Sequence, residues 1–295
     1  MRRSLGILTL ILITLIWGTT FVIVKETVAT VSPALLLALR FSVAAALFAW
    51  VRPSRKALVP GLILGVLSFL GFATQTLGLV STTASKAAFI TGLSVILTPL
   101  FSALWFRYRG FHQSVPVRAY LAAAVALIGL GLMSLTGVQG VTEGDVWILG
   151  TAVFYAFYIL YLGEVAPRYG ALELSAVQFW PMALLAWLWA FPQLGRLTSL
   201  SAGSVWSIVY LGAVATALVS VLQVRAQRVV SAHVAALIFV LEPVFAALFA
   251  YLLLGERLGA WGWVGAALVG VAMLLSELKM TKKESGGLEP TPPAP

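Results

Sequence analysis

The sequence predicts an all-α polytopic membrane protein with ten transmembrane helices arranged as two inverted five-helix repeats. Three observations predict this fold class. Of the 295 residues, 61% are hydrophobic and 10% are charged, whereas about a quarter of the residues of a soluble domain are charged. The apolar residues gather in ten long runs, and the second half of the chain repeats short motifs of the first half. These properties exclude an ordinary soluble globular protein.

The apolar runs have the length of membrane-spanning helices. A span needs about 20 mostly apolar residues, and its backbone amides must be satisfied within the segment, which favours helices over alternating barrel strands. Arg2 and Arg3 precede the first run, but no small-residue cleavage site closes it, so we interpret it as a retained helix rather than a secretory signal. The runs cover residues 5–24, 34–51, 58–79, 85–105, 119–136, 146–165, 172–191, 206–224, 232–254 and 259–278.

Five short motifs recur in the same order in the two halves of the chain, which indicates an internal duplication. Each half then holds five helices, and this odd number inverts the second half relative to the membrane. We expect a first repeat at 1–138, a second at 139–279, and a disordered cytoplasmic tail at 280–295. The matching motifs are Trp17-Gly18 with Tyr155-Ala156, Leu39-Arg40-Phe41 with Val177-Gln178-Phe179, Leu64-Gly65-Val66 with Leu211-Gly212-Ala213, Leu97-Thr98-Pro99 with Leu241-Glu242-Pro243, and Ala126-Leu127-Ile128-Gly129 with Ala267-Leu268-Val269-Gly270.

The net charge of +9 reports orientation in the membrane. Fourteen of the 19 Lys and Arg residues fall in loops on the side of the two termini, four fall on the opposite side, and Arg40 lies within the second run. By the positive-inside rule, both termini are expected in the cytoplasm, for a protein of the cell (inner or plasma) membrane. A nucleic-acid partner is not expected, because no folded basic domain is present.

Inverted repeats are typical of secondary transporters, which hold their substrate near the membrane midplane where the repeats meet. Pro99 and Pro243 are expected to interrupt equivalent helices, and paired interruptions of this kind point to the binding site. The alternatives are a non-transporting membrane scaffold or sensor, or a channel, built on the same fold. Export of small organic metabolites, amino-acid-like or drug-like, by alternating access is the function that we expect.

Several motifs together resemble the EamA-type members of the drug/metabolite transporter superfamily. The resemblance covers residues 5–278 and implies ten helices in two inverted repeats, with export or exchange of small metabolites; it does not imply a particular substrate. One motif of the second half has no counterpart in the first half, where Phe106-Arg107-Tyr108-Arg109-Gly110 stands instead. The motifs that carry the resemblance are Trp17-Gly18-Thr19-Thr20-Phe21, Leu39-Arg40-Phe41, the Thr98-Pro99 and Glu242-Pro243 pairs, and Leu254-Gly255-Glu256-Arg257-Leu258 before Gly265 and Gly270.

Two charged residues lie deep in the predicted spans. Glu242 falls near the midplane, where an ionised carboxylate is costly and indicates function by default. It serves either as a proton relay, with protons as the coupling ion, or as a structural partner of Arg40 or of backbone groups freed by Pro243. Arg40 lies about 9 Å from the outer end of its helix. It either snorkels outward, pairs with Glu242, or holds a substrate carboxylate.

Uncharged polar and aromatic residues complete the candidate site. Phe154, Phe157, Tyr158 and Tyr161 form a stripe on one face of the predicted sixth helix, suited either to helix packing or to the wall of a cavity for an aromatic solute. The candidate cavity-lining residues are Trp17, Thr20, Arg40, Gln75, Thr91, Ser94, Tyr155, Tyr158, Gln178, Trp180 and Glu242.

Residues for enzymatic chemistry are scarce. The chain has no cysteine, its single aspartate, Asp145, is expected in a loop, and His112 and His233 share no motif. No phosphate-binding loop is present. We therefore expect neither enzymatic activity nor a cofactor, and the expected partners are a small-molecule substrate, the lipid bilayer and protons.

Overall fold

The computed structural model describes residues 2–108, 121–122, 124–129, 132, 140–230 and 232–277. Helices dominate these residues, and no strand occurs among them. The α-helices are α1 (Arg3–Thr27), α2 (Pro33–Leu47), α3 (Arg55–Ser81), α4 (Ala84–Thr91), α5 (Ser94–Tyr108), α7 (Glu143–Val165), α8 (Ala171–Ala190), α9 (Ala202–Val209), α10 (Val219–Gln227), α11 (Ala232–Phe239), α12 (Leu241–Leu254) and α13 (Ala260–Glu277). The 3₁₀-helix η1 (Phe191–Ser199) follows α8, and the π-helix η2 (Tyr210–Leu218) joins α9 to α10.

The all-helical, membrane-spanning character predicted from the sequence is confirmed. Three apolar helices of 10–17 residues are shorter than a full membrane span: Pro33–Leu47, Leu241–Leu254 and Ala260–Ala272. The predicted segment at 119–136 lies largely outside the described residues, although 121–122, 124–129 and 132 are helical. Among the described residues, six helices are long and apolar enough to cross a membrane: Arg3–Thr27, Arg55–Ser81, Ala84–Ser102, Glu143–Val165, Ala171–Gly195 and Ala202–Gln227.

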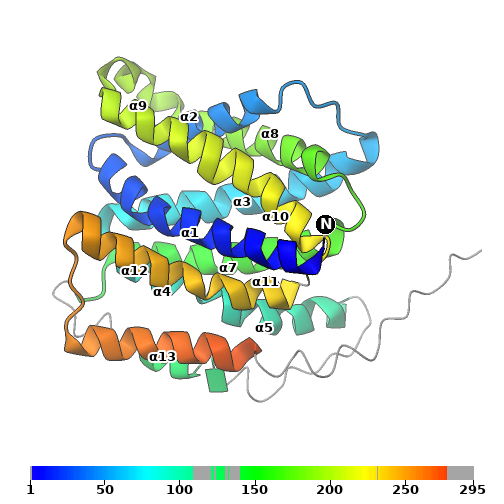
Figure 1. Ribbon diagram of the computed structural model, residues 1–295. Coiled ribbons are helices and arrows are strands. Elements are labelled where there is room, and N and C mark those ends of the chain that lie inside the picture. The colour runs from blue at the N-terminus through cyan, green and yellow to red at the C-terminus, as the bar shows by residue number, and fades with distance from the viewer. Residues whose placement is uncertain are drawn as a thin grey trace, which may run out of the picture.

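The helices lie side by side as a bundle (Figure 1). At one edge, α13 lies against α5 and α11, and at the opposite edge α2 packs against α8 and α9. Between these edges, α1 packs along α12, and α3 packs along both α7 and α8. Helices from the two halves of the sequence therefore alternate in space, and the core forms where they meet.

Local sequence signals set several helix ends. Ser32 caps α2 by accepting a hydrogen bond from the Leu35 amide, with Pro33 at the first helical position, where a missing amide hydrogen costs nothing. Thr142 and Asp145 form a reciprocal capping box at the start of α7. Gly255 ends α12 with a φ of +64°, a left-handed conformation that glycine adopts without steric cost. Asp145, expected in a loop, thus belongs to the first turn of a helix.

Two predicted segments are interrupted, but not at their prolines. Gly92 and Leu93 separate α4 from α5, and Val240 separates α11 from α12. Pro243 is the third residue of α12, within the first turn, where proline is tolerated. Pro99 lies inside α5, farther from its break. The paired interruption is therefore present, and both breaks precede the prolines that were expected to cause them.

Glycines allow close contact between the two halves of the chain. A Cβ atom at Gly65 of α3 would overlap the backbone carbonyl of Gln178 in α8. A Cβ atom at Gly212 of η2 would lie 2.7 Å from the carbonyl oxygen of Arg40 in α2. Small residues at such crossings let helix backbones approach within van der Waals contact, a main source of helix association in membranes.

Replacing Gly65 by alanine is expected to destabilise the bundle by about 1–3 kcal/mol, the usual cost of overpacking, because the carbonyl of Gln178 is backbone and cannot turn aside. The matched control is Gly270→Ala in α13, where an added Cβ meets nothing within 4 Å. Thermal unfolding of the purified protein in detergent measures both. Equal melting temperatures for the two variants would contradict this account of the α3–α8 crossing.

Candidate functional site

A cavity of about 60 Å³ lies between helices from both halves of the chain. One water molecule needs about 10–15 Å³ of such volume, so the cavity holds a few waters in this conformation and must widen for a metabolite. Its lining residues are Trp17, Thr20, Ser68, Phe72, Gln75, Thr91, Gly92, Ser94, Val95, Tyr155, Tyr158, Ile159, Ala215, Thr216, Val219, Ser220, Gln223, Phe239 and Glu242.

The structure brings together most of the candidate residues from the sequence. Arg40, Gln178 and Trp180 are not part of the lining. The candidates that share the cavity are Trp17 and Thr20 on α1, Gln75 on α3, Thr91 and Ser94 at the α4–α5 break, Tyr155 and Tyr158 on α7, and Glu242 on α12.

Both helix interruptions open onto this cavity. Thr91 is the last residue of α4 and Ser94 the first of α5, while Phe239 ends α11 and Glu242 is the second residue of α12. Backbone that leaves the helical hydrogen-bond pattern at membrane depth is tolerated where it is buried in protein or lines a watery cavity. The cavity is therefore a place in the bundle where breaks in the helices are tolerated.

Glu242 lines the cavity in the first turn of α12. The positive end of the helix dipole at this turn favours a carboxylate. Among the described residues, its side chain forms no hydrogen bond or ion pair. The alternative in which Arg40 pairs with Glu242 is therefore not realised in this structure, and the carboxylate faces the cavity without a protein cation.

Arg40 is buried behind the cavity wall, with 1% of its surface exposed, so it does not snorkel outward. Its Nε donates a hydrogen bond of 2.7 Å to Thr216 Oγ1, and its guanidinium carbon lies 4.3 Å from the centroid of the Phe72 ring. Its Nη2 has no hydrogen-bond partner. Phe72 and Thr216 both line the cavity, so they stand between the guanidinium group and the site.

Gln178 and Trp180 lie in different environments on α8. Gln178 supports the wall from outside, because its Oε1 accepts a hydrogen bond of 3.2 Å from the Tyr158 hydroxyl. Trp180 is 48% exposed, on the same face as the exposed Leu184 and Leu188. The spacing of four residues places these three side chains on the outer surface of the bundle, away from the cavity.

The aromatic stripe of α7 divides between two roles. Within it, Tyr158 lines the cavity, whereas Phe157 stacks on Phe101 with ring centroids 4.6 Å apart. Tyr155, beside the stripe, also lines the cavity and meets the edge of the Phe72 ring at 5.8 Å. Sequence reasoning missed Phe72 and Ser68, although with Gln75 they follow helical spacing along one face of α3.

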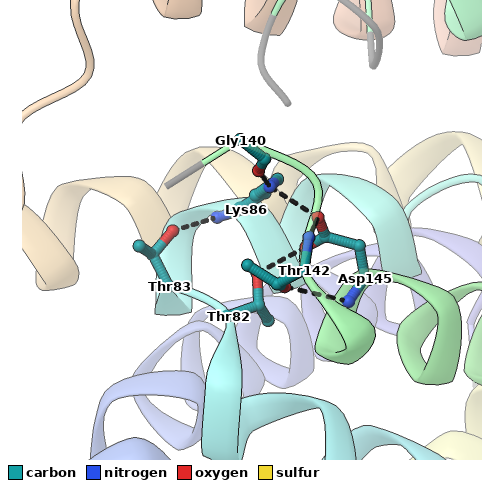
Figure 2. Close-up of polar contacts among 6 residues, drawn as sticks. All are labelled: Thr82, Thr83, Lys86, Gly140, Thr142 and Asp145. Carbon is teal, nitrogen blue, oxygen red and sulfur yellow. Dashed lines mark hydrogen bonds and ion pairs between the residues drawn. The ribbon is translucent and has the colours of Figure 1, made fainter. Parts of the chain in front are cut away.

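A polar cluster closes the bundle where α3, α4 and α7 meet (Figure 2). Lys86 forms an ion pair with Asp145, with 8% and 6% of their side chains exposed. Thr82 Oγ1 donates to Asp145 Oδ1 at 2.6 Å, and the Thr142 amide donates to Oδ2 at 2.9 Å. Lys86 Nζ also donates to the Gly140 carbonyl at 2.6 Å. Partners on both ions make a buried pair tolerable.

Glu256 holds the start of α4 from the other side. Its carboxylate accepts hydrogen bonds from the Ala84 amide at 2.8 Å, the Ser85 amide at 3.0 Å and the Ser85 hydroxyl at 2.7 Å. These amides are otherwise unsatisfied at a helix N-terminus. All eight residues of α4 are buried, so this short helix fills the end of the bundle between α1, α3, α7 and α12.

Replacing Thr216 by valine removes the acceptor of the buried Arg40 Nε and is expected to cost about 1.5–3 kcal/mol, the range for hydrogen bonds to charged groups. The control is Thr151→Val, which removes a neutral hydroxyl pair with Thr74 at 2.9 Å and is expected to cost about 0.5–1.5 kcal/mol. Thermal unfolding in detergent compares the two. A smaller loss for Thr216→Val than for Thr151→Val would show that Arg40 does not depend on this hydroxyl.

Known proteins resemble the chain over nearly its whole length. An uncharacterized transporter of Archaeoglobus fulgidus is 30% identical over 281 residues, which cover 95% of this chain and 88% of that protein. A second uncharacterized transporter of the same organism is 27% identical over 227 residues, covering 76% and 77%. A solved crystal structure matches with a TM-score of 0.66 at 18% identity, covering 96% of this chain and 100% of that one, which shows likeness of fold alone.

The family model for the EamA-like transporter family matches the chain twice, over residues 4–135 and 142–278. These two matches leave only a short linker and the chain ends uncovered. Together with the apolar helices long enough to span a bilayer, they identify the chain as a member of the EamA-like transporter family and a multi-pass membrane transporter.

Proposed function

We propose that the protein is a secondary active transporter that exports small organic metabolites, amino-acid-like or drug-like, by alternating access. The substrate occupies the cavity around Glu242, near the midplane of the cell (inner or plasma) membrane. Ten spans form two inverted repeats, residues 1–138 and 139–279, and both termini lie in the cytoplasm. The observation that carries this proposal is that four pairs of cavity-lining residues occupy equivalent positions in the two halves.

Lining residues pair across the chain at the spacings of the internal repeat. On the first helix of each half the spacing is 138 residues, and on the third helix it is 147. Such pairing is what a binding site on a pseudo-two-fold axis in the membrane plane requires. The pairs are Trp17 with Tyr155, Thr20 with Tyr158, Ser68 with Ala215, and Phe72 with Val219.

Helix packing follows the same reciprocal pattern. Gly65 and Gly212, which are equivalent in the repeat, contact the carbonyls of Gln178 and Arg40 respectively, which are equivalent as well. Each half therefore inserts its third helix against the second helix of the other half. The short helices α4 and α11 are both eight residues long and both end at the cavity. This symmetry supports two halves that rock against each other to expose the cavity to one side and then the other.

The end of the bundle that holds Lys86, Asp145 and Glu256 is tied together by an ion pair and by hydrogen bonds to the start of α4. By the positive-inside rule this end faces away from the cytoplasm. Access from that side requires α4 to separate from α7 and from the loop that carries Glu256, which breaks the polar cluster of Figure 2. In this proposal the cluster is the outer gate, and Glu242 is the group that couples transport to protons.

Purified protein in liposomes is expected to show saturable counterflow: labelled solute enters faster when unlabelled solute is loaded inside. A panel of amino acids, nucleosides and quaternary ammonium compounds supplies the solutes. A channel would give flux without this acceleration, and a scaffold or sensor would give none with any solute. Either result would refute the proposed carrier function.

Joining α4 to α7 covalently is expected to stop transport. The chain has no cysteine, so Lys86→Cys with Asp145→Cys gives a single thiol pair across the gate. A short bifunctional methanethiosulfonate reagent, which replaces the reach of the lysine side chain, should lower counterflow at least tenfold in the double variant, and dithiothreitol should restore it, because the gate must open once per cycle. Each single variant is the control: it can react with the reagent but cannot be cross-linked, and it should keep its counterflow. A cross-linked protein that transports at its full rate would exclude this gate.

A further inference from the structure

The lining of the cavity carries charge of one sign. Glu242 is the single acidic side chain in the described lining, and no Lys, Arg or His side chain belongs to that lining. The Glu242 carboxylate has no hydrogen-bond or ion-pair partner among the described residues. A carboxylate in a low-dielectric site requires a counter-charge or hydrogen-bond donors. None of the described side chains supplies either of them on the cavity side.

The guanidinium group of Arg40 lies behind the cavity wall. Its Nε donates to Thr216 and its face lies over Phe72, and these two side chains line the cavity, whereas Arg40 does not. Lys25 and Lys86 donate to groups near Asp145, at one end of α7. Among the described residues, no basic side chain therefore pairs with Glu242 or belongs to the cavity lining.

Aromatic rings form much of the remaining wall. Trp17 packs against Phe239 with ring centroids 5.4 Å apart, and Phe72 meets Tyr155 at 5.8 Å. All four residues line the cavity. The faces of such rings attract cations, most of all quaternary or alkylated ammonium groups, whose charge is spread over apolar carbon atoms. The one full negative charge and the rings thus favour the same class of ligand.

We propose that this cavity selects organic monocations, namely alkylated amines and quaternary ammonium compounds, with the ammonium group held by the ionised carboxylate of Glu242. Transport of these cations rests on the function proposed above, whereas their binding does not. One carboxylate matches one positive charge, and the aromatic wall accommodates the apolar part of the solute. Thr98, the uncharged residue that the repeated motif aligns with Glu242, contributes no second charge.

The test uses a matched series of probes on the purified full-length protein. The cations are choline, tetraethylammonium and benzyltrimethylammonium; benzyl alcohol and benzoate are the neutral and anionic analogues. Equilibrium dialysis with radiolabelled probes measures binding in detergent, and counterflow in liposomes measures transport. We expect the cations to bind at least tenfold more tightly than either analogue. We also expect Glu242→Gln to abolish this preference.

Glu26→Gln is the matched control, because Glu26 is an exposed carboxylate at the end of α1, and it should leave cation binding unchanged. Failure of all three cations to bind wild-type protein, or equal binding of benzyl alcohol, would overturn the inference without requiring a folded Glu242 variant. Cation binding that persists in folded Glu242→Gln protein would also overturn it. Glu242-dependent binding without counterflow would support the cation site and refute the proposed transport. Counterflow restricted to neutral or anionic solutes would support the proposed transport and refute the cation site.

Discussion

Hydrocarbon supplies no hydrogen-bond partners, and this constraint determines where the chain is permitted to be irregular. The spans are helical because a helix satisfies its own backbone. The two breaks, at Gly92 and Leu93 and at Val240, occur where protein and the cavity surround them. The π-helix η2 reaches the cavity at Ala215 and Thr216, and π-helical turns frequently mark functional sites. The two breaks and the π-helix therefore converge on one place in the bundle, whereas the 3₁₀-helix η1 lies outside the cavity lining.

The same constraint acts on the two charges near the cavity, with different results. The buried guanidinium of Arg40 is stabilised by an aromatic face and a hydroxyl group contributed by α3 and η2, so it ties α2 to both neighbours. Glu242 has no such partner among the described residues, and only the positive end of its own helix favours its charge. Arg40 thus helps to hold the helices together, whereas the Glu242 carboxylate remains available to a ligand. The repeated motifs align Arg40 with Gln178 and Glu242 with Thr98, and both of these counterparts are uncharged.

The sequence predicts how deep a residue lies in the membrane better than it predicts which face of the helix that residue occupies. Polar and aromatic residues far from the ends of the spans are predicted to line the cavity, and four of them meet there: Trp17, Thr20, Gln75 and Glu242. Trp180 satisfies the same criterion but points outward, because depth does not specify which face of α8 is buried. The hydrogen-bond partner of Arg40 could not be predicted from the sequence either, because Thr216 lies 176 residues away along the chain. Only tertiary packing joins them.

The helix breaks show a similar limit. Pro99 and Pro243 lie in the two predicted segments that are interrupted. Each interruption occurs before its proline, and Pro243 fits into the first turn of the helix that follows the break. Between break and proline, the first half holds about one turn more than the second. The ten spans in inverted repeats rest on motif spacing and stay a prediction.

Glu256 forms three hydrogen bonds to the start of α4, and the corresponding segment of the first half, Phe106-Arg107-Tyr108-Arg109-Gly110, contains no acid that could form the same contacts. Two inverted halves with identical gates would rest equally often in either orientation. A hydrogen bond to a charged group contributes about 1.5–3 kcal/mol, and about 1.4 kcal/mol already corresponds to a tenfold ratio of populations. In the proposed alternating-access cycle, these contacts favour the orientation in which the solute-free binding site faces the side opposite Glu256. A loop that has no acidic counterpart in the first half would in this way give direction to an otherwise reversible cycle.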